Sequence, residues 1–257
     1  MRVLLLLAAY PWLAEPDPAQ SLEKRIPPPA GFARVRADGF GAWLRGLPLK
    51  PGRPQVLLFD GNPKRNQDLH VAVADLDTGT RDLQQCADSV IRLRAEYLWE
   101  RRAAIAFQFT SGDLCEWSRW ADGWRPVVKG NRVTWRKGGA GGRDHAELQR
   151  YLKTVFTYAG TISLARETEG ASGAVEAGDM FIQGGSPGHV VLVLDVAEKD
   201  SKRVFLLGQG YSPAQDFHVL KNPSGASPWY AADFGEELRT PEWTFRRGDR
   251  RRFKKEP

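Results

Sequence analysis

The last third of the chain is dominated by strand-forming segments, and this feature constrains the fold more than any other. Three short apolar runs, at residues 179–182, 190–196 and 204–207, are separated by glycine-rich or charged stretches. Such runs are typical of neighbouring strands in one sheet. Helical periodicity falls earlier, with one helix predicted from about residue 82 and a second over 145–158. Helices first and an antiparallel sheet later indicate an α+β fold.

The first of these helices is expected to carry Cys86 in its first turn. Asp82 followed by Gln85 is the acidic form of a capping box, and apolar residues then recur at helical spacing. Free backbone N–H groups and the helix dipole stabilise a thiolate at a helix N-terminus, so we expect a lowered thiol pKa. A cysteine packed in the core at the same place would be inert. The spacing alone leaves both interpretations of Cys86 open.

His189 opens a strand at the end of a glycine-rich loop, residues 184–188. A strand end holds the imidazole rigidly, and Gly188 lets a substrate approach closely, which suits a general base. A histidine that only forms a hydrogen bond at a strand end is the alternative. Gln209 follows the next strand, and its amide oxygen could fix the imidazole tautomer. With Cys86, these residues form a candidate nucleophile, base and orienting residue.

Residues 177–193 contain a Gly-Asp pair, an apolar strand, a glycine loop and a Gly-His pair. This pattern resembles the paired strands of NlpC-type and CHAP-type cell-wall cysteine hydrolases. The resemblance implies a papain-like, NlpC-like fold, with a nucleophile helix packed on a mostly antiparallel sheet. It assigns the catalytic roles to Cys86, His189 and Gln209. The separation of Cys86 and His189 exceeds that of compact members, so the resemblance also implies an insertion over residues 103–160.

A second resemblance covers nearly the whole chain. Signature segments of the bacterial domain of unknown function 4846 are similar to residues 82–88, 92–97, 158–161, 181–189 and 213–223. Members of that family mostly look like exported or lipid-anchored envelope proteins. The resemblance therefore implies a fold grouping and a place in the cell envelope, but no activity.

Charge and apolar patterning favour an exported or envelope protein. Met1 and Arg2 followed by apolar residues 3–9 are similar to an export signal, although a truncated or misassigned start and a cytoplasmic location stay open. No apolar run is long enough to span a membrane. The net charge is +6, and no basic stripe interleaved with aromatic residues indicates nucleic acid as a partner.

The domain organisation is predicted as one α+β domain over residues 32–245. Residues 1–31 are expected to be a signal-like and proline-rich lead-in, with residues 14–31 extended rather than helical. Residues 111–144 are expected to be an inserted loop region rich in tryptophan and glycine, with short strands. Residues 246–257 are expected to be a basic tail, either solvated or docked on an anionic polymer.

Four further residues are candidate substrate contacts. Asp179 binds substrate or stabilises a turn, and Gly188 leaves room for the substrate beside His189. His218 reaches the same site or forms loop hydrogen bonds. Trp120 lies in a loop whose tryptophans could form the floor of a binding groove for sugar or peptide. Acidic residues and histidines do not combine at metal-ligand spacing, so neither a metal nor another cofactor is expected.

These observations predict an exported cysteine hydrolase that cleaves an amide or peptide bond, with the peptide or glycan of cell-wall peptidoglycan as its partner. The alternative is a non-catalytic envelope binding module on the same scaffold, with the loop at 111–144 and the groove beneath residues 184–188 as its binding surface. A disulfide between Cys86 and Cys115 would contradict the hydrolase. The oligomeric state has no signature in the sequence.

Overall fold

The computed structural model describes residues 10–254, so the signal-like stretch at residues 3–9 and residues 255–257 of the basic tail lie outside the described residues. Its secondary structure is mixed, with few helices and a mostly antiparallel sheet. The α+β class predicted from the sequence is confirmed at this level.

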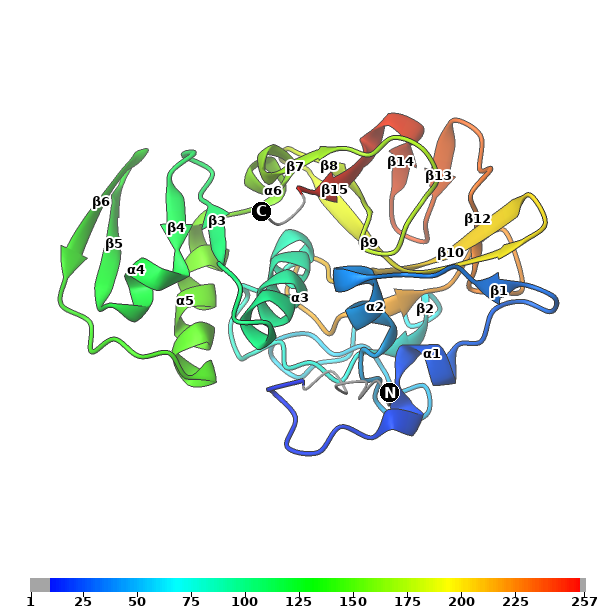
Figure 1. The fold of residues 1–257 in the computed structure, drawn as a ribbon, viewed down its shortest axis with the longest axis horizontal. Coiled ribbons are helices and arrows are strands. Elements are labelled where there is room, and N and C mark those ends of the chain that lie inside the picture. The colour runs from blue at the N-terminus through cyan, green and yellow to red at the C-terminus, as the bar shows by residue number, and fades with distance from the viewer. Residues whose placement is uncertain (1–9, 255–257) are drawn as a thin grey trace, which may run out of the picture.

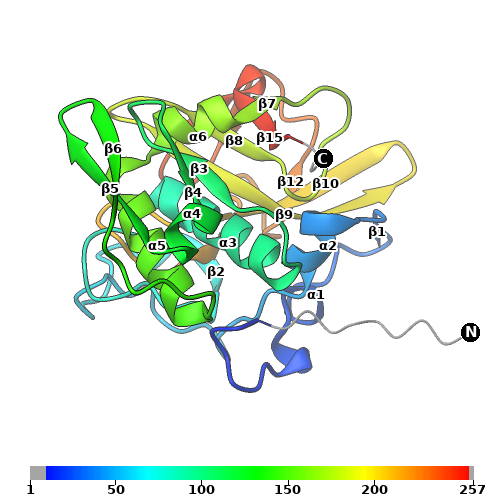
Figure 2. The same cartoon turned by 60° about the vertical axis from the view of Figure 1, so that its left-hand side comes forward.

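Among residues 10–254, nine strands form one central sheet (Figures 1 and 2). Its strands are β1 (Ala33–Arg34), β2 (His70–Val73), β7 (Thr168–Gly170), β8 (Met180–Gln183), β9 (His189–Lys199), β10 (Lys202–Gln209), β11 (His218–Leu220), β12 (Tyr230–Ala231) and β15 (Arg250–Phe253). The main path is β2-β11-β10-β9-β8-β15-β7, while β1 pairs with β9 and β12 with β10. The three apolar runs of the sequence thus lie side by side as β8, β9 and β10.

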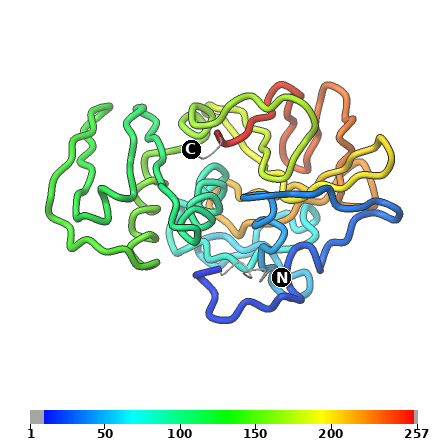
Figure 3. The backbone as a smooth tube through the Cα atoms, in the orientation of Figure 1, coloured from blue at the N-terminus to red at the C-terminus, as the bar shows by residue number. Residues whose placement is uncertain are grey.

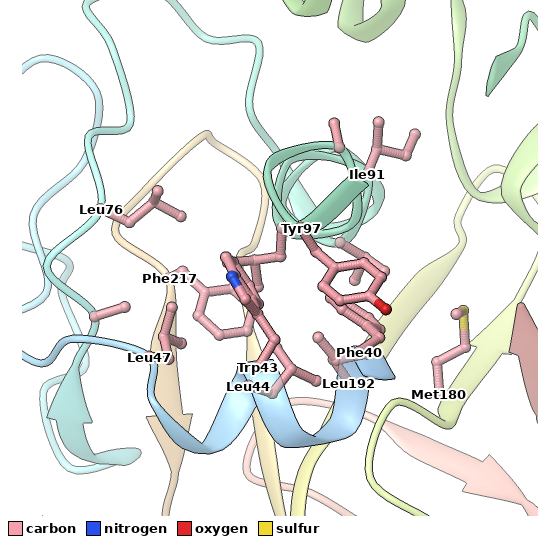
Figure 4. Close-up of a cluster of buried hydrophobic side chains, with 14 of the residues drawn as sticks. Phe40, Trp43, Leu44, Leu47, Leu76, Ile91, Tyr97, Met180, Leu192 and Phe217 are labelled. Atoms are coloured by element: carbon pink, nitrogen blue, oxygen red, sulfur yellow. The ribbon is translucent and has the colours of Figure 1, made fainter. Parts of the chain in front are cut away.

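Both faces of these strands are buried, which explains their continuous apolar sequence. On one face, Leu192 of β9 joins the core formed with α2 (Gly39–Arg45) and α3 (Cys86–Glu100). Figure 4 shows this core, where Phe40 of α2 lies against Tyr97 of α3 with ring centroids 5.3 Å apart. On the other face, Val191 packs with Phe245 of the hairpin β13 (Glu237–Arg239) and β14 (Thr244–Arg246).

A smaller lobe lies beside α3, at the left of Figure 1. It contains β3 (Ala106–Gln108), β4 (Leu114–Glu116), α4 (Trp117–Ala121), β5 (Trp124–Lys129), β6 (Arg132–Lys137) and α5 (His145–Tyr158). The tube in Figure 3 follows the chain through this lobe and back to the sheet by way of α6 (Thr161–Glu167). The helix predicted over residues 145–158 is confirmed, and the segment 111–144 contains a helix as well as the predicted short strands.

The lead-in predicted to be extended is partly helical, so that prediction is wrong. Pro18–Gln20 forms the 3₁₀ turn η1, and α1 spans Leu22–Arg25. Proline is tolerated in the first turn because its missing N–H would have no helical partner there. Leu22 is fully buried, and its backbone N–H donates to the Leu47 carbonyl at 2.9 Å. The lead-in is therefore part of the folded core.

The basic tail, predicted to be solvated or docked on an anionic polymer, belongs to the sheet in its described part. After the short turn η2 (Arg247–Asp249), β15 pairs with β8 and β7. The fully buried Asp179 accepts hydrogen bonds from Arg252 at 2.5 and 3.1 Å, and Arg250 lies 3.8 Å from the same carboxylate. A buried carboxylate needs charged partners, so these arginines pair with an internal acid.

Candidate active site

Cys86 lies in the first turn of α3, as the sequence predicts, but the helix and its capping box begin about one turn later than expected, so that Cys86 is the first helical residue. Gln85 is the N-cap, and its backbone N–H donates to Asp88 Oδ2 at 3.2 Å. Asp82 instead accepts from the backbone N–H of Ala214 at 2.7 Å and from the Gln85 side chain at 2.9 Å. It thereby ties the start of α3 to the segment that follows β10.

Cys86 and His189 line one cavity of about 600 Å³. The glycine loop, Thr161 of α6 and the side chains of Tyr211 and Trp243 complete its wall. A larger hollow of about 1170 Å³ lies beside β10 and β12, but its lining contains no cysteine or histidine. The smaller cavity is therefore the candidate active site.

The His189 imidazole is enclosed by aromatic rings. Its centroid lies 4.8 Å from that of Tyr211, 5.4 Å from Trp243 and 5.9 Å from Phe245. The indole N–H of Trp243 donates to Gln183 Oε1 at 2.9 Å, which holds this ring in place. Burial, aided by the nearby Lys64 charge, lowers the pKa of His189 to about 4. The imidazole is neutral near pH 7.

Gln209 lies where the sequence places it, at the end of β10, and contacts His189. Its Oε1 is 2.8 Å from Nε2 of His189, in keeping with the predicted orienting contact. Its Nε2 donates to Glu242 Oε2 at 2.7 Å and lies 3.3 Å from Nε2 of His218. His218 is fully buried behind Gln209 and does not line the cavity, so it is not placed to touch a substrate there.

The thiol of Cys86 has a raised pKa, which contradicts the expectation of a lowered one. Burial is the largest cause and the carboxyl of Asp88 the second, and together they raise the pKa of Cys86 to about 11. The backbone N–H groups of Ala87 and Val190 oppose this rise. Val190 directly follows His189 in β9. Cys86 is therefore a neutral thiol near pH 7.

The carboxyl group of Asp88, two residues after Cys86, also belongs to a residue that lines the cavity. It is 6% exposed, and its Oδ1 has no hydrogen-bond partner among the described residues. Burial raises the pKa of Asp88 well above that of a free carboxyl. A buried carboxyl oxygen without a partner is costly, and this cost disfavours the charged form of Asp88.

Gly188 lines the cavity next to His189, as predicted, and it also packs closely against the protein itself. A Cβ atom at this position would lie 2.5 Å from Thr161 Oγ1 and 2.6 Å from the Gly185 carbonyl oxygen. Any larger residue would displace the loop that carries His189. The glycine therefore keeps α6 and the loop together.

Two predicted substrate contacts lie away from the cavity. Asp179 is occupied by Arg250 and Arg252 at the edge between β8 and β15. Trp120 is 5% exposed, its indole N–H donates to Glu147 at 2.7 Å, and the Arg125 guanidinium lies 3.9 Å from its ring. Trp120 thus joins α4 to α5 in the smaller lobe and does not line the cavity.

Several residues of the site were missed by sequence reasoning. Tyr211 stands two residues after Gln209, so the alternation of side chains along a strand could have indicated it. Glu242 and Trp243 come from the turn between β13 and β14, and no local pattern links them to His189. Lys64, whose Nζ is 2.7 Å from Glu242, lies in an irregular segment before β2.

Cys86 and Cys115 are both free. Within residues 10–254, no three side chains of His, Cys, Asp or Glu are grouped as a metal site would require. None of the helices that the structure describes is long and apolar enough to cross a membrane.

The residues of this site fall inside a segment shared with other proteins. The family described as Domain of unknown function (4846) matches residues 22–252. The chain belongs to this family. Neither the curated proteins nor the solved structures give a significant match. The matched segment includes α1, which the predicted domain boundaries left out.

Proposed function

We propose that this protein is a cysteine hydrolase that cleaves an amide or peptide bond on a papain-like, NlpC-like scaffold. Cys86 is the nucleophile, His189 the general base and Gln209 the orienting residue. One observation carries the proposal. A thiol at a helix N-terminus and an imidazole at a strand end line the same cavity, and an amide oxygen holds one imidazole nitrogen at 2.8 Å.

The protonation states define how the reaction would start. With the pKa of Cys86 at about 11 and that of His189 at about 4, both groups are neutral near pH 7. Proton transfer would then accompany attack: Nδ1 of His189 accepts the thiol proton while the sulfur bonds to the substrate carbonyl carbon. Nε2 keeps its proton and its hydrogen bond to Gln209.

The remaining steps use the same groups. The imidazolium returns its proton to the departing amine, which leaves an acyl thioester on Cys86. Water gives a proton to His189 and attacks the thioester carbonyl carbon. The imidazolium then gives that proton to the departing sulfur, so a carboxylic acid leaves and the thiol is restored. The free backbone N–H groups at the start of α3, that of Cys86 among them, would stabilise the oxyanion.

The substrate that we propose is a peptide of the cell wall, and the protein would act in the cell envelope or after secretion. A cavity of about 600 Å³ can take a short peptide segment or a small ligand. The net charge of +6 favours association with an anionic envelope.

Digestion of purified peptidoglycan tests the proposal. Wild-type protein, Cys86→Ala and Cys115→Ala would each be incubated with it, and released fragments would be identified by mass spectrometry. Cys115 is the matched control because it is the second free cysteine and does not line the cavity. We expect wild type and Cys115→Ala to release fragments and Cys86→Ala to release none.

Two results would contradict the hydrolase. Release of fragments by Cys86→Ala would remove Cys86 as the nucleophile. Binding of peptidoglycan by wild type and Cys86→Ala alike, with no release by either, would favour the binding module. That module has lost one of its expected contacts, because Trp120 is buried in the smaller lobe.

A further inference from the structure

The amide group of Gln209 is held on both of its ends. Its Oε1 lies 2.8 Å from Nε2 of His189. Its Nε2 lies 2.7 Å from Glu242 Oε2 and 3.3 Å from Nε2 of His218. Gln209 and His218 are fully buried, so water does not compete for these contacts.

The two partners on the nitrogen side can only accept a hydrogen bond. A carboxylate such as Glu242 has no proton to donate. Nδ1 of His218 lies 2.9 Å from the backbone carbonyl oxygen of Asp216, which is also only an acceptor. Nδ1 of His218 must therefore carry the proton, and Nε2 of His218 is left as an acceptor.

These acceptors determine how Gln209 is oriented. If the amide turned over, its oxygen would face Glu242 and His218, and two contacts between acceptors would replace two hydrogen bonds. The NH₂ group must therefore face Glu242 and His218, and Oε1 must face His189. An amide oxygen accepts only from a protonated nitrogen, so Nε2 of His189 must carry a proton. In the neutral imidazole, Nδ1 is then unprotonated.

Glu242 is itself fixed by Lys64. The Nζ atom of Lys64 lies 2.7 Å from Glu242 Oε1, on the carboxylate oxygen that Gln209 does not use. Lys64 is also 3.3 Å from Gln215 Oε1 and 4.6 Å from the centroid of the Tyr211 ring. These contacts pair the carboxylate with a cation on one oxygen and leave the other oxygen to accept from Gln209.

We propose that Glu242 and His218 are positioning residues that select the His189 tautomer through Gln209. This selection leaves Nδ1 as the basic nitrogen that the thiol of Cys86 needs. The role of this tautomer in catalysis rests on the proposed hydrolase function. The tautomer itself follows from the hydrogen bonds alone. Neither residue needs to touch substrate.

Nitrogen-15 NMR of histidine-labelled protein at pH 7 tests this directly. The chain has only four histidines, so each signal can be assigned with single His→Gln variants. In wild type, we expect His189 to be protonated at Nε2 and His218 at Nδ1. In Glu242→Met, which removes the acceptor, we expect His189 to populate both tautomers.

Two further variants separate positioning from a general loss of structure. Glu242→Asp keeps two acceptor oxygens, one for Lys64 and one for Gln209, so we expect it to recover the single His189 tautomer at least in part. Glu237→Met lies in the same β hairpin, at a side chain that is 54% exposed, and should leave the tautomer unchanged. An unchanged His145 signal, from the smaller lobe, shows that each variant is folded.

The rate of peptide cleavage should change in the same variants as the tautomer. We expect Glu242→Met to lower kcat by about 10- to 100-fold with little change in KM, as for other residues that orient a functional histidine. Glu242→Asp should recover part of this loss.

Two NMR results would overturn the inference. They are a wild-type His189 protonated at Nδ1, and a folded Glu242→Met protein with an unchanged tautomer. The expected tautomers in a protein that cleaves no peptide would instead contradict the hydrolase and leave the positioning network in place.

Discussion

The surroundings of Cys86 and Cys115 show what separates a candidate nucleophile from an inert thiol. Burial raises the pKa of both, to about 11 for Cys86 and about 12 for Cys115. Cys115 is wholly buried in β4, where its carbonyl accepts from the Tyr151 hydroxyl at 2.7 Å. Cys86 keeps some exposure to a cavity that it shares with His189. A cavity and a neighbouring base distinguish the two sites, whereas the direction of the pKa shift does not.

Removal of the base is the largest expected effect. We expect His189→Gln to lower the rate of peptide cleavage by about 10²- to 10⁴-fold, because the thiol then has no group to take its proton. The matched control is His145→Gln in α5. His145 lies 2.9 Å from Glu96 of α3 and does not line the cavity. Equal losses of kcat/KM in the two variants would contradict the distinction between the cavity that holds Cys86 and the smaller lobe that holds Cys115.

The second largest expected effect is a difference in alkylation rate between the two thiols. We expect iodoacetamide to label Cys86 at least about 100-fold faster than Cys115 in the native protein, because Cys115 becomes accessible only through local opening. The rate at Cys86 should rise with pH through about 11. Peptide mapping after timed quenching would measure both rates. Faster labelling of Cys115, or a Cys86 inflection below the value of a free thiol near 8.5, would contradict this account.

The contribution to the pH dependence of stability should differ in sign between His189 in the cavity and Glu167, which contacts the smaller lobe. His189 has a pKa of about 4 when folded and about 6.5 when unfolded, so the unfolded state binds the proton first as pH falls. This group alone should reduce stability by about 2 kcal/mol between pH 7 and pH 5. Denaturant unfolding at both pH values should therefore show a smaller acid loss in His189→Gln than in wild type.

Glu167, which accepts a hydrogen bond from the Gln108 backbone at the smaller lobe, should act in the opposite direction. Burial raises its pKa to about 7, so the folded state binds the proton first and gains stability as pH falls below 7. Glu167→Gln should then show a larger acid loss than wild type. The same change of slope in both variants would refute the assigned protonation states.

The smallest expected effect concerns Asp88. Its carboxyl is the second cause of the raised Cys86 pKa, so Asp88→Asn should lower the alkylation inflection modestly. Asparagine keeps an oxygen that can accept from the Gln85 backbone, so α3 should keep its cap. Asp113→Asn, on the loop before β4, is the control that should leave the inflection unchanged.

The site was predictable where its residues follow local patterns. Helical spacing after residue 85 located Cys86, and the succession of apolar runs located His189 and Gln209 on strands that pair as neighbours. Glu242 could not be found this way because it reaches Gln209 from a hairpin 33 residues further along the chain.

The partners of charged groups and the burial of titratable groups could not be predicted from the sequence. The arginines of β15 looked like a solvated tail because their partner, Asp179, lies 73 residues earlier in the chain. The thiol pKa was misjudged for a related reason. The helix N-terminus is visible in the sequence, but desolvation depends on everything that packs around Cys86.

Capture of an acyl group on the protein tests the central claim most directly. Native protein at pH 7 would be mixed with p-nitrophenyl acetate, quenched at intervals and mapped by mass spectrometry, with Cys86→Ala and Cys115→Ala in parallel. We predict a thioester on Cys86 that forms rapidly and then decays, in wild type and Cys115→Ala alike. An acyl group that forms on Cys115, or a Cys86 that stays unmodified in folded protein, would contradict the account.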